Sequence, residues 1–329
     1  MARCESATAL AFARRGQVME EGRWTFELPR PYSLAITVQL LRRTPNNLVN
    51  RWEAGKYIRG VRTPHGNCLV TVRQCGSIEA SCAEVTIYAP SMSEPVHDGV
   101  AAMLRRVLGV DVEVAELSTR FDVEPGLQSI AQHLRGMRPP RFPDLFETIA
   151  SVVPFQQLSL ESGAALLNRL VQTFGEPVEH NALHAWVFPS AASVAGATLA
   201  DVLSCGFSTA KADVLKNLAM MITHGELTEG RLAELPTAAL LRTLDDLPGV
   251  GPWTAAVIAL RGFGRLDAFP QGDAGIRRYL GQVFGRAEPL SDDEERGLVE
   301  RLGPARGLLY FYVLGWRLAQ RGLIGEIVP

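Results

Sequence analysis

Asp273 is the side chain of this sequence with the clearest potential for chemistry. It ends the segment Phe269-Pro270-Gln271-Gly272-Asp273 and stands at the start of a predicted helix at 273–283. This is a typical position for a helix N-cap, so the pattern by itself favours a structural role. The helix dipole also favours the ionised carboxylate, and a fixed anion is useful in an active site where positive charge develops. The two roles are compatible.

A glycine hairpin precedes this carboxylate, at Leu247-Pro248-Gly249-Val250-Gly251-Pro252-Trp253. Apolar residues recur on one helical face on both sides of it, which predicts amphipathic helices at 237–246 and 252–263. Gly249 and Gly251 leave their backbone N–H groups uncovered at the start of the second helix, where they can bind a phosphate oxygen. The hairpin is therefore a candidate phosphate-binding element that carries no charge of its own.

The hairpin with its downstream Asp resembles the helix-hairpin-helix DNA glycosylase superfamily, and most closely its alkylation-repair branch, 3-methyladenine DNA glycosylase II. The resemblance extends to Phe155-Gln156-Gln157-Leu158-Ser159, to Ser208-Thr209-Ala210-Lys211-Ala212 and to Leu308-Leu309-Tyr310-Phe311-Tyr312. It runs from about residue 22 to about residue 320 and is weakest in the N-terminal third. It implies an enzyme that bends duplex DNA, flips out a damaged nucleotide and cleaves its glycosidic bond.

Under this resemblance Asp273 is the catalytic residue. It would stabilise the oxocarbenium-like sugar as the base leaves, and it would orient the attacking water. Lyase-competent members of the superfamily carry a Lys where this chain has Trp253, and that Lys forms a Schiff base with the sugar. We therefore expect a monofunctional enzyme that leaves an abasic site.

The resemblance implies an aromatic base pocket, for which the candidates are Trp253, Tyr310 and Phe311. A purine methylated at N3 of adenine or N7 of guanine is cationic and can stack on an electron-rich ring. From the pattern alone, Trp253 is explained about equally well as a core residue at a helix start. The C-terminal aromatics, with Tyr312 and Trp316, are more often core residues. The sequence does not assign which of them lines the pocket.

Further DNA contacts follow from the same resemblance. Gln157 would fill the gap left by the flipped nucleotide, with Leu158 as the alternate; an equally good interpretation has Gln157 capping the next helix. The phosphate-binding residues would be Gly249, Gly251 and Thr254.

A structural cation at the hairpin is also implied, held by the backbone carbonyls of Leu247 and Val250. We expect no organic cofactor. The five cysteines show no pairing pattern and no zinc-ligand spacing, although Cys68, Cys75 and Cys82 recur every seven residues. No cysteine follows Cys205, so we expect no iron–sulfur loop of the kind found in some superfamily members.

Composition indicates a globular protein with one large core or two ordinary ones. No apolar run is long enough to span a membrane and the first residues do not resemble a signal sequence, so we expect a cytoplasmic protein, nucleoid-associated if bacterial. The net charge is −2, with the acidic excess in the C-terminal part, which argues against tight non-specific DNA binding. Candidates for supplementary phosphate contacts are Lys211, Lys216, Arg261 and Arg277.

The predicted fold is α+β and predominantly α. We expect a disordered tail at 1–21, an N-terminal α+β domain with a small antiparallel sheet at 22–112, and an all-helical region of two bundles at 113–329, with the helix-hairpin-helix at 237–263. In the N-terminal domain, strands are predicted at 34–38, 57–61, 68–72 and 84–88, and helices at 43–53 and 95–108. The helices predicted after residue 140 include 144–153, 158–174, 181–187, 198–203, 208–223, 291–300 and 304–321.

The sequence thus predicts a monofunctional DNA glycosylase that excises alkylated purines such as 3-methyladenine and 7-methylguanine in base-excision repair. The expected partner is double-stranded DNA with damaged bases, bound by a monomer away from membranes. Two alternatives remain at this stage. One is a glycosylase for oxidised or deaminated bases; the other is a non-catalytic helix-hairpin-helix DNA-binding protein in which Asp273 only caps a helix.

Overall fold

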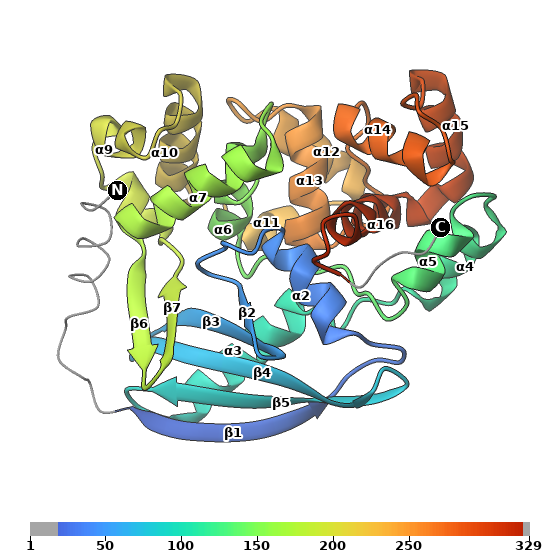
Figure 1. Cartoon of the computed structure of the whole chain (residues 1–329). Helices are drawn as coiled ribbons and strands as arrows, with labels where there is room; N and C mark the ends of the chain where they lie inside the picture. Colours follow the sequence, from blue (N-terminus) through green and yellow to red (C-terminus); the bar gives the residue numbers. More distant parts are fainter. Residues whose placement is uncertain (1–18, 325–329) are drawn as a thin grey trace.

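One seven-stranded sheet and a larger set of helices make up the chain, which the computed structural model describes from residue 19 to residue 324 (Figure 1). In Figure 1 the sheet lies below most of the helices. The predicted α+β class with a predominance of helix is confirmed. The expected tail at 1–21 lies mostly outside the described residues, but Glu20 and Glu21 already belong to the first strand.

The N-terminal strands pair antiparallel in the order β1-β5-β4-β3, with β2 on the other side of β3. In β5 every second residue is buried, as expected for a strand with one covered face. The strands predicted at 57–61, 68–72 and 84–88 are confirmed. The strands are β1 (Glu20–Glu27), β2 (Arg51–Glu53), β3 (Lys56–Thr63), β4 (Gly66–Ser77) and β5 (Ala80–Ala89).

Two helices share a hydrophobic core with this sheet, α2 (Leu34–Arg42) and α3 (Glu94–Val107). The predicted strand at 34–38 is wrong, because this segment begins α2. Its β-branched residues suggested a strand, but Ser33 caps the segment through the N–H of Ile36, and tertiary packing overrides the weak strand preference. The predicted helix at 43–53 is also wrong: the segment is a turn followed by β2.

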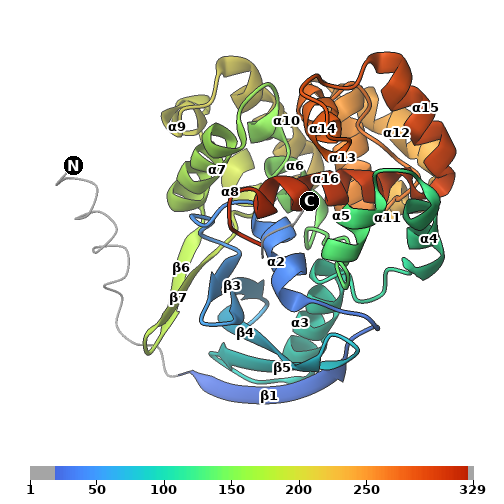
Figure 2. The same cartoon turned by 45° about the vertical axis from the view of Figure 1, so that its right-hand side comes forward.

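The remaining helices form two groups above the sheet, which Figure 2 shows beside each other, with α16 running between them and the sheet. The first group contains α6 (Leu145–Ala150), η1 (Val153–Phe155), α7 (Leu160–Phe174), α8 (Ala191–Ala195), α9 (Leu199–Ser204) and α10 (Thr209–Thr223). The second contains α12 (Thr237–Asp245), α13 (Pro252–Phe263), α14 (Ala274–Val283), α15 (Asp292–Leu302), η2 (Gly303–Ala305) and α16 (Arg306–Ala319), flanked by α4 (Ala115–Val123) and α5 (Gln128–His133). The short helix α11 (Glu229–Ala233) joins the two groups in sequence.

A β-hairpin interrupts the region that we expected to be all-helical. It consists of β6 (Glu176–His180) and β7 (Leu183–Val187), and β7 joins the N-terminal sheet beside β3. The predicted helix at 181–187 is therefore wrong. Asn181 makes the tight turn of this hairpin with a φ of 53°. An asparagine is typical of such turns, and it was the residue in the sequence that could have indicated the hairpin. Gly60 allows the close approach, because a Cβ there would lie 2.8 Å from the backbone of β7.

Cys75 and Cys82 lie directly opposite each other on β4 and β5, with their sulfur atoms 2.8 Å apart. The sequence showed no pairing pattern, because the pairing comes from the hairpin register. Both thiols are free and half-buried, whereas Cys68 and Cys205 are buried. We expect a mild disulfide oxidant to link Cys75 to Cys82 within one molecule, which peptide mapping would detect. The Cys82→Ser variant is the control; an unlinked Cys75 in the oxidised parent chain would contradict the expectation.

No helix among residues 19–324 combines the length and apolar character that crossing a bilayer requires.

Candidate active site

A cavity of about 550 Å³ lies between the two helical groups and contains Asp273. Its walls come from the end of α2, the segment that leads into α7, helices α13, α14 and α16, and Pro289 in the loop before α15. The polar and aromatic residues that line it are Arg43, Phe155, Ser159, Trp253, Asp273, Arg278, Tyr279, Tyr310 and Arg317. A volume of this size is typical of cavities that bind small molecules.

Asp273 caps α14, and its carboxylate is held by two donors. Oδ1 accepts the backbone N–H of Ile276 at 2.9 Å, and Oδ2 accepts the indole N–H of Trp253 at 2.7 Å. The side chain is half-buried and lines the cavity. The capping interpretation is therefore correct, and it coexists with an accessible carboxylate whose orientation is fixed by a helix start and an indole ring.

Glu295 supports the turn that carries Asp273, and no motif in the sequence pointed to this role. Its Oε2 accepts the backbone N–H of Gly272 at 2.9 Å, and the side chain is buried on α15. Burial raises the pKa of Glu295; the Gly272 N–H and the charge of Arg277 partly offset this, and the negative charge of Asp273 adds a smaller rise. A second carboxylate thus lies behind Asp273 on the protein side of the turn.

Replacing Glu295 tests whether this contact positions Asp273. Glu295→Gln keeps an acceptor for the Gly272 N–H, so the rate at saturating substrate should stay within about threefold of the parent rate. Glu295→Leu removes the acceptor and should lower that rate about tenfold, with KM little changed, because a misplaced catalytic group affects the reaction more than binding. Single-turnover kinetics on both variants measures the difference, and equal rates for the two would exclude the positioning role.

Two of the three expected pocket aromatics line the cavity. Trp253 and Tyr310 do so, whereas Phe311 is fully buried in the helical core, edge-on to Tyr310. The prediction of Phe311 as a pocket residue is corrected accordingly: the helix turns its side chain away from the cavity. Tyr279, which the sequence did not single out, also lines the cavity.

The two hairpin glycines differ in what the protein itself requires of them. Gly249 has a φ of 76°, and a Cβ there would lie 2.0 Å from Val214. Gly251 has ordinary extended angles, and a Cβ there would meet nothing within 4 Å. Both residues are exposed. The fold therefore needs a glycine at 249, while at 251 the free protein would accept a side chain.

Gln156 connects the loop before α7 to this hairpin. Its side-chain N–H group donates to the carbonyl of Gly249 at 3.0 Å and to the hydroxyl of Thr254 at 2.9 Å. Thr254 is buried and its hydroxyl accepts the bond from Gln156, so its predicted phosphate contact, which stays a prediction, would have to come from the main chain. Only the Thr254 backbone N–H, in the first turn of α13, remains suitable for that contact.

The expected wedge residues project from the same loop. Gln157 and Leu158 are exposed, and Leu158 also lines the cavity. Gln157 has a φ of 55°, and the N-cap of α7 is Ser159, so the alternative in which Gln157 caps that helix is wrong. Lys211 holds this loop by donating a hydrogen bond to the carbonyl of Gln156 at 2.6 Å.

The four cationic side chains proposed to contact phosphate make hydrogen bonds or ion pairs within the protein. Arg261 is fully buried and donates to the carbonyl of Leu40 at the end of α2, and burial lowers its pKa to about 9. Arg277 pairs with Asp292, while Lys211 and Lys216 donate to backbone carbonyls. A supplementary phosphate role for Arg261 is excluded by its burial.

Among residues 19–324, no three His, Cys, Asp or Glu side chains are grouped as metal ligands. The cation expected at the carbonyls of Leu247 and Val250 stays a prediction. The carbonyl of Leu247 already accepts the Val250 N–H at 3.0 Å, which closes the hairpin turn.

The sequence pattern of the HhH-GPD superfamily of base excision DNA repair proteins matches residues 150–304, which include the hairpin, Gln156 and Asp273. Residues 150–304 of this chain belong to the HhH-GPD superfamily. A relative in Bacillus subtilis (strain 168), a DNA-3-methyladenine glycosylase, is 30% identical over 153 residues, or 46% of this chain and 50% of that protein. The chain spans 50% of the length of that relative and 43% of a Mycobacterium tuberculosis relative, a probable bifunctional transcriptional activator/DNA repair enzyme AlkA.

Two solved structures share the fold over nearly the whole chain. The 3-methyladenine DNA-glycosylase from Archaeoglobus fulgidus has a TM-score of 0.74 and 23% identity, covering 91% of this chain and 98% of that one. The Clostridium acetobutylicum 8-oxoguanine glycosylase/lyase has a TM-score of 0.68 and 20% identity, covering 91% and 98%. These likenesses establish the fold, including the N-terminal sheet, but not the substrate.

Proposed function

We propose that this chain is a monofunctional DNA glycosylase that excises alkylated purines from duplex DNA during base-excision repair. The observation that carries the proposal is the oriented carboxylate of Asp273, which lies in a cavity between two helical groups, beside a hairpin with exposed amides. The relatives named as 3-methyladenine glycosylases support the choice of alkylated bases. Members of the superfamily that act on 8-oxoguanine keep the oxidised-base alternative open.

In this mechanism the hairpin amides bind a phosphate near the damaged nucleotide, and the nucleotide rotates into the cavity. Gln157 or Leu158 fills the gap left in the base stack. The C1′–N9 bond breaks with its electron pair going to the base, and Asp273 stabilises the positive charge on the sugar. A water oxygen then bonds to C1′, and the proton that it loses passes to Asp273 and on to solvent.

The absence of a suitable amine argues for hydrolysis alone. No lysine lines the Asp273 cavity. By the sequence resemblance, Trp253 stands where lyase-competent members carry the Schiff-base lysine. Lys211 donates to the carbonyls of Pro154 and Gln156, before α7. The proposed product is therefore an intact strand with an abasic site.

Incubation with methylated duplex DNA, followed by chromatography of the released bases, tests the proposal directly. We expect release of 3-methyladenine and 7-methylguanine, no strand cleavage, and no covalent complex after borohydride reduction. Release of oxidised bases with a trapped complex would overturn the monofunctional assignment. Binding of DNA without release of any base would favour the non-catalytic alternative.

A further inference from the structure

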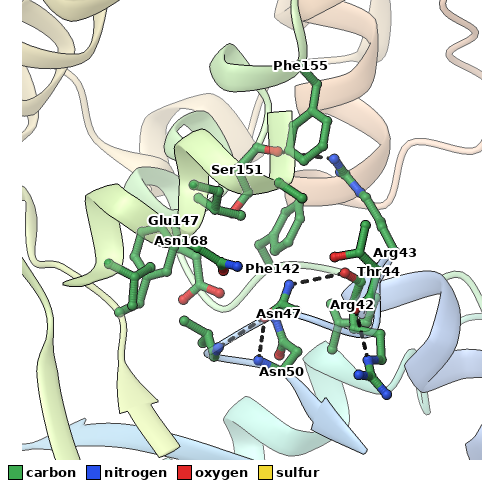
Figure 3. Close-up of a pocket in the computed structure, with 16 residues that line it drawn as sticks. Arg42, Arg43, Thr44, Asn47, Asn50, Phe142, Glu147, Ser151, Phe155 and Asn168 are labelled. Carbon is green, nitrogen blue, oxygen red and sulfur yellow. Dashed lines mark hydrogen bonds between the residues drawn. The ribbon is translucent and has the colours of Figure 1, made fainter. Parts of the chain in front are cut away.

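Arg43 is a buried cation in the wall of the Asp273 cavity, and the mechanism above leaves it without a role. It follows α2 and reaches the cavity from the sheet side, whereas most of the lining residues come from the helical groups. Figure 3 shows its side chain extending from the end of α2 toward Phe155 and Ser151. Only 7% of the residue is exposed.

The guanidinium of Arg43 has a fixed position but incomplete hydrogen bonding. Nη1 donates to the carbonyl of Ser151 at 3.2 Å, and the central carbon lies 4.6 Å from the centre of the Phe155 ring (Figure 3). Nε and Nη2 are buried and have no hydrogen-bond partner. Buried N–H groups of an arginine are costly when they stay unpaired, so two free donors in one side chain call for an acceptor.

No carboxylate of the described residues forms an ion pair with Arg43. Its charged and titratable neighbours are Tyr310 and another buried arginine, Arg261, and burial lowers the pKa of Arg43. A second cavity beside Arg43, of about 10 Å³, has room for about one water molecule (Figure 3). One water can pair with one of the free donors, and the other has no acceptor among the described residues, although Arg43 also lines the Asp273 cavity.

Besides its aromatic rings, the Asp273 cavity is lined by more positively charged than negatively charged side chains. The lining residues include one carboxylate, Asp273, and three guanidinium groups, Arg43, Arg278 and Arg317. Arg278 and Arg317 also lie near the ring of Tyr279, at 4.9 Å and 5.4 Å from its centre. A cationic base is therefore repelled by these arginines as well as attracted by the aromatic rings.

We propose that Arg43 is a specificity-determining residue that donates hydrogen bonds to an acceptor atom of the flipped base, and that it extends the substrate range to neutral bases with a carbonyl oxygen or an unprotonated ring nitrogen. This inference rests on the proposed glycosylase function. When a neutral base leaves with the electron pair of the C1′–N9 bond, it carries a negative charge until it takes a proton from solvent. A charged donor in contact with the base stabilises that anion.

A cationic base gains less from the same contact. A purine methylated at N7 becomes neutral as the glycosidic bond breaks, so no anion forms for Arg43 to stabilise. Removing the guanidinium also removes a repulsion from the bound reactant. The two base classes should therefore respond differently to substitution of Arg43, whereas damage to the fold would lower the release of both.

The test compares Arg43→Met with the parent chain on duplexes that contain hypoxanthine, a neutral base with a carbonyl, or 7-methylguanine, a cationic one. We expect the ratio of hypoxanthine release to 7-methylguanine release to fall about 10- to 100-fold. Arg43→Lys keeps the charge without the planar fork, so its hypoxanthine rate should lie between the other two. Equal losses on both bases would overturn the role of Arg43.

A measurement on the unaltered chain keeps the proposal testable if the variants fold poorly. Free hypoxanthine should inhibit 7-methylguanine release about tenfold more strongly than free purine, which lacks the carbonyl oxygen. Equal inhibition would count against the contact. Release of neither base by the parent chain would defeat the proposed function and this inference together, whereas 7-methylguanine release with an unchanged ratio in Arg43→Met defeats only the inference.

Discussion

Asp273→Asn is expected to lower the rate of base release from methylated duplex DNA by about 100- to 1,000-fold, which is the usual cost of removing a group that stabilises charge in a transition state. The carboxamide is neutral and cannot stabilise the positive sugar as the carboxylate does. Single-turnover kinetics with chromatography of the released base measures the effect. Release at the parent rate would show that Asp273 is only a helix cap.

The folded state should survive this substitution, because asparagine is as good an N-cap as aspartate. The amide offers one acceptor oxygen where the carboxylate offers two, so either the Ile276 N–H or the Trp253 indole N–H loses its partner. We expect a stability loss of about 1 kcal/mol and an unchanged affinity for undamaged DNA. Thermal unfolding and a binding titration verify that the variant is intact.

Trp253→Phe is the matched control, since it keeps an aromatic ring and removes the indole N–H that holds Asp273 Oδ2. If the indole only orients the carboxylate, the rate should fall about tenfold, well short of the Asp273→Asn loss. Equal losses for the two variants would mean that orientation by the indole accounts for most of the contribution of Asp273.

The parts of this site that the sequence predicted are those encoded in a short segment. The preferences of glycine, proline and N-cap residues over a few positions predict the hairpin, the capping position of Asp273 and the helix start next to Trp253. Their helices were predicted to within a few residues because the apolar period continues through them. The same local signals placed Gln157 and Leu158 in the loop before α7.

The parts that the sequence did not predict depend on contacts between distant segments. Glu295 reaches Gly272 from α15, and Arg43 reaches the cavity from the sheet side of the molecule. Phe311 and Tyr310 are neighbours in sequence, yet only the helix orientation decides that one faces the core and the other the cavity. The segment that became β7 was misassigned because its pairing partner in the N-terminal sheet, β3, is remote in the chain.

Gly249→Ala and Gly251→Ala are expected to fail in different ways. At 249 an alanine must adopt a φ of 76° and displace Val214, so we expect the free energy of unfolding to fall by about 2–4 kcal/mol. At 251 the added methyl group meets nothing within 4 Å and the angles are ordinary, so stability should change by less than about 0.5 kcal/mol. Chemical denaturation measures both values.

The Gly251 variant then isolates the hairpin as a binding surface. Its methyl group projects from the exposed hairpin and would separate a phosphate oxygen from the backbone N–H groups, so duplex affinity should fall about tenfold or more, equivalent to about 1.4 kcal/mol. Gly230→Ala on α11 is the matched control, because a Cβ there also meets nothing within 4 Å. If Gly251→Ala binds duplex DNA as tightly as Gly230→Ala, the hairpin amides do not contact phosphate. Because the hairpin N–H donors are uncharged, the duplex affinity of the parent chain should also depend less on salt than that of a protein that binds DNA through many lysines and arginines.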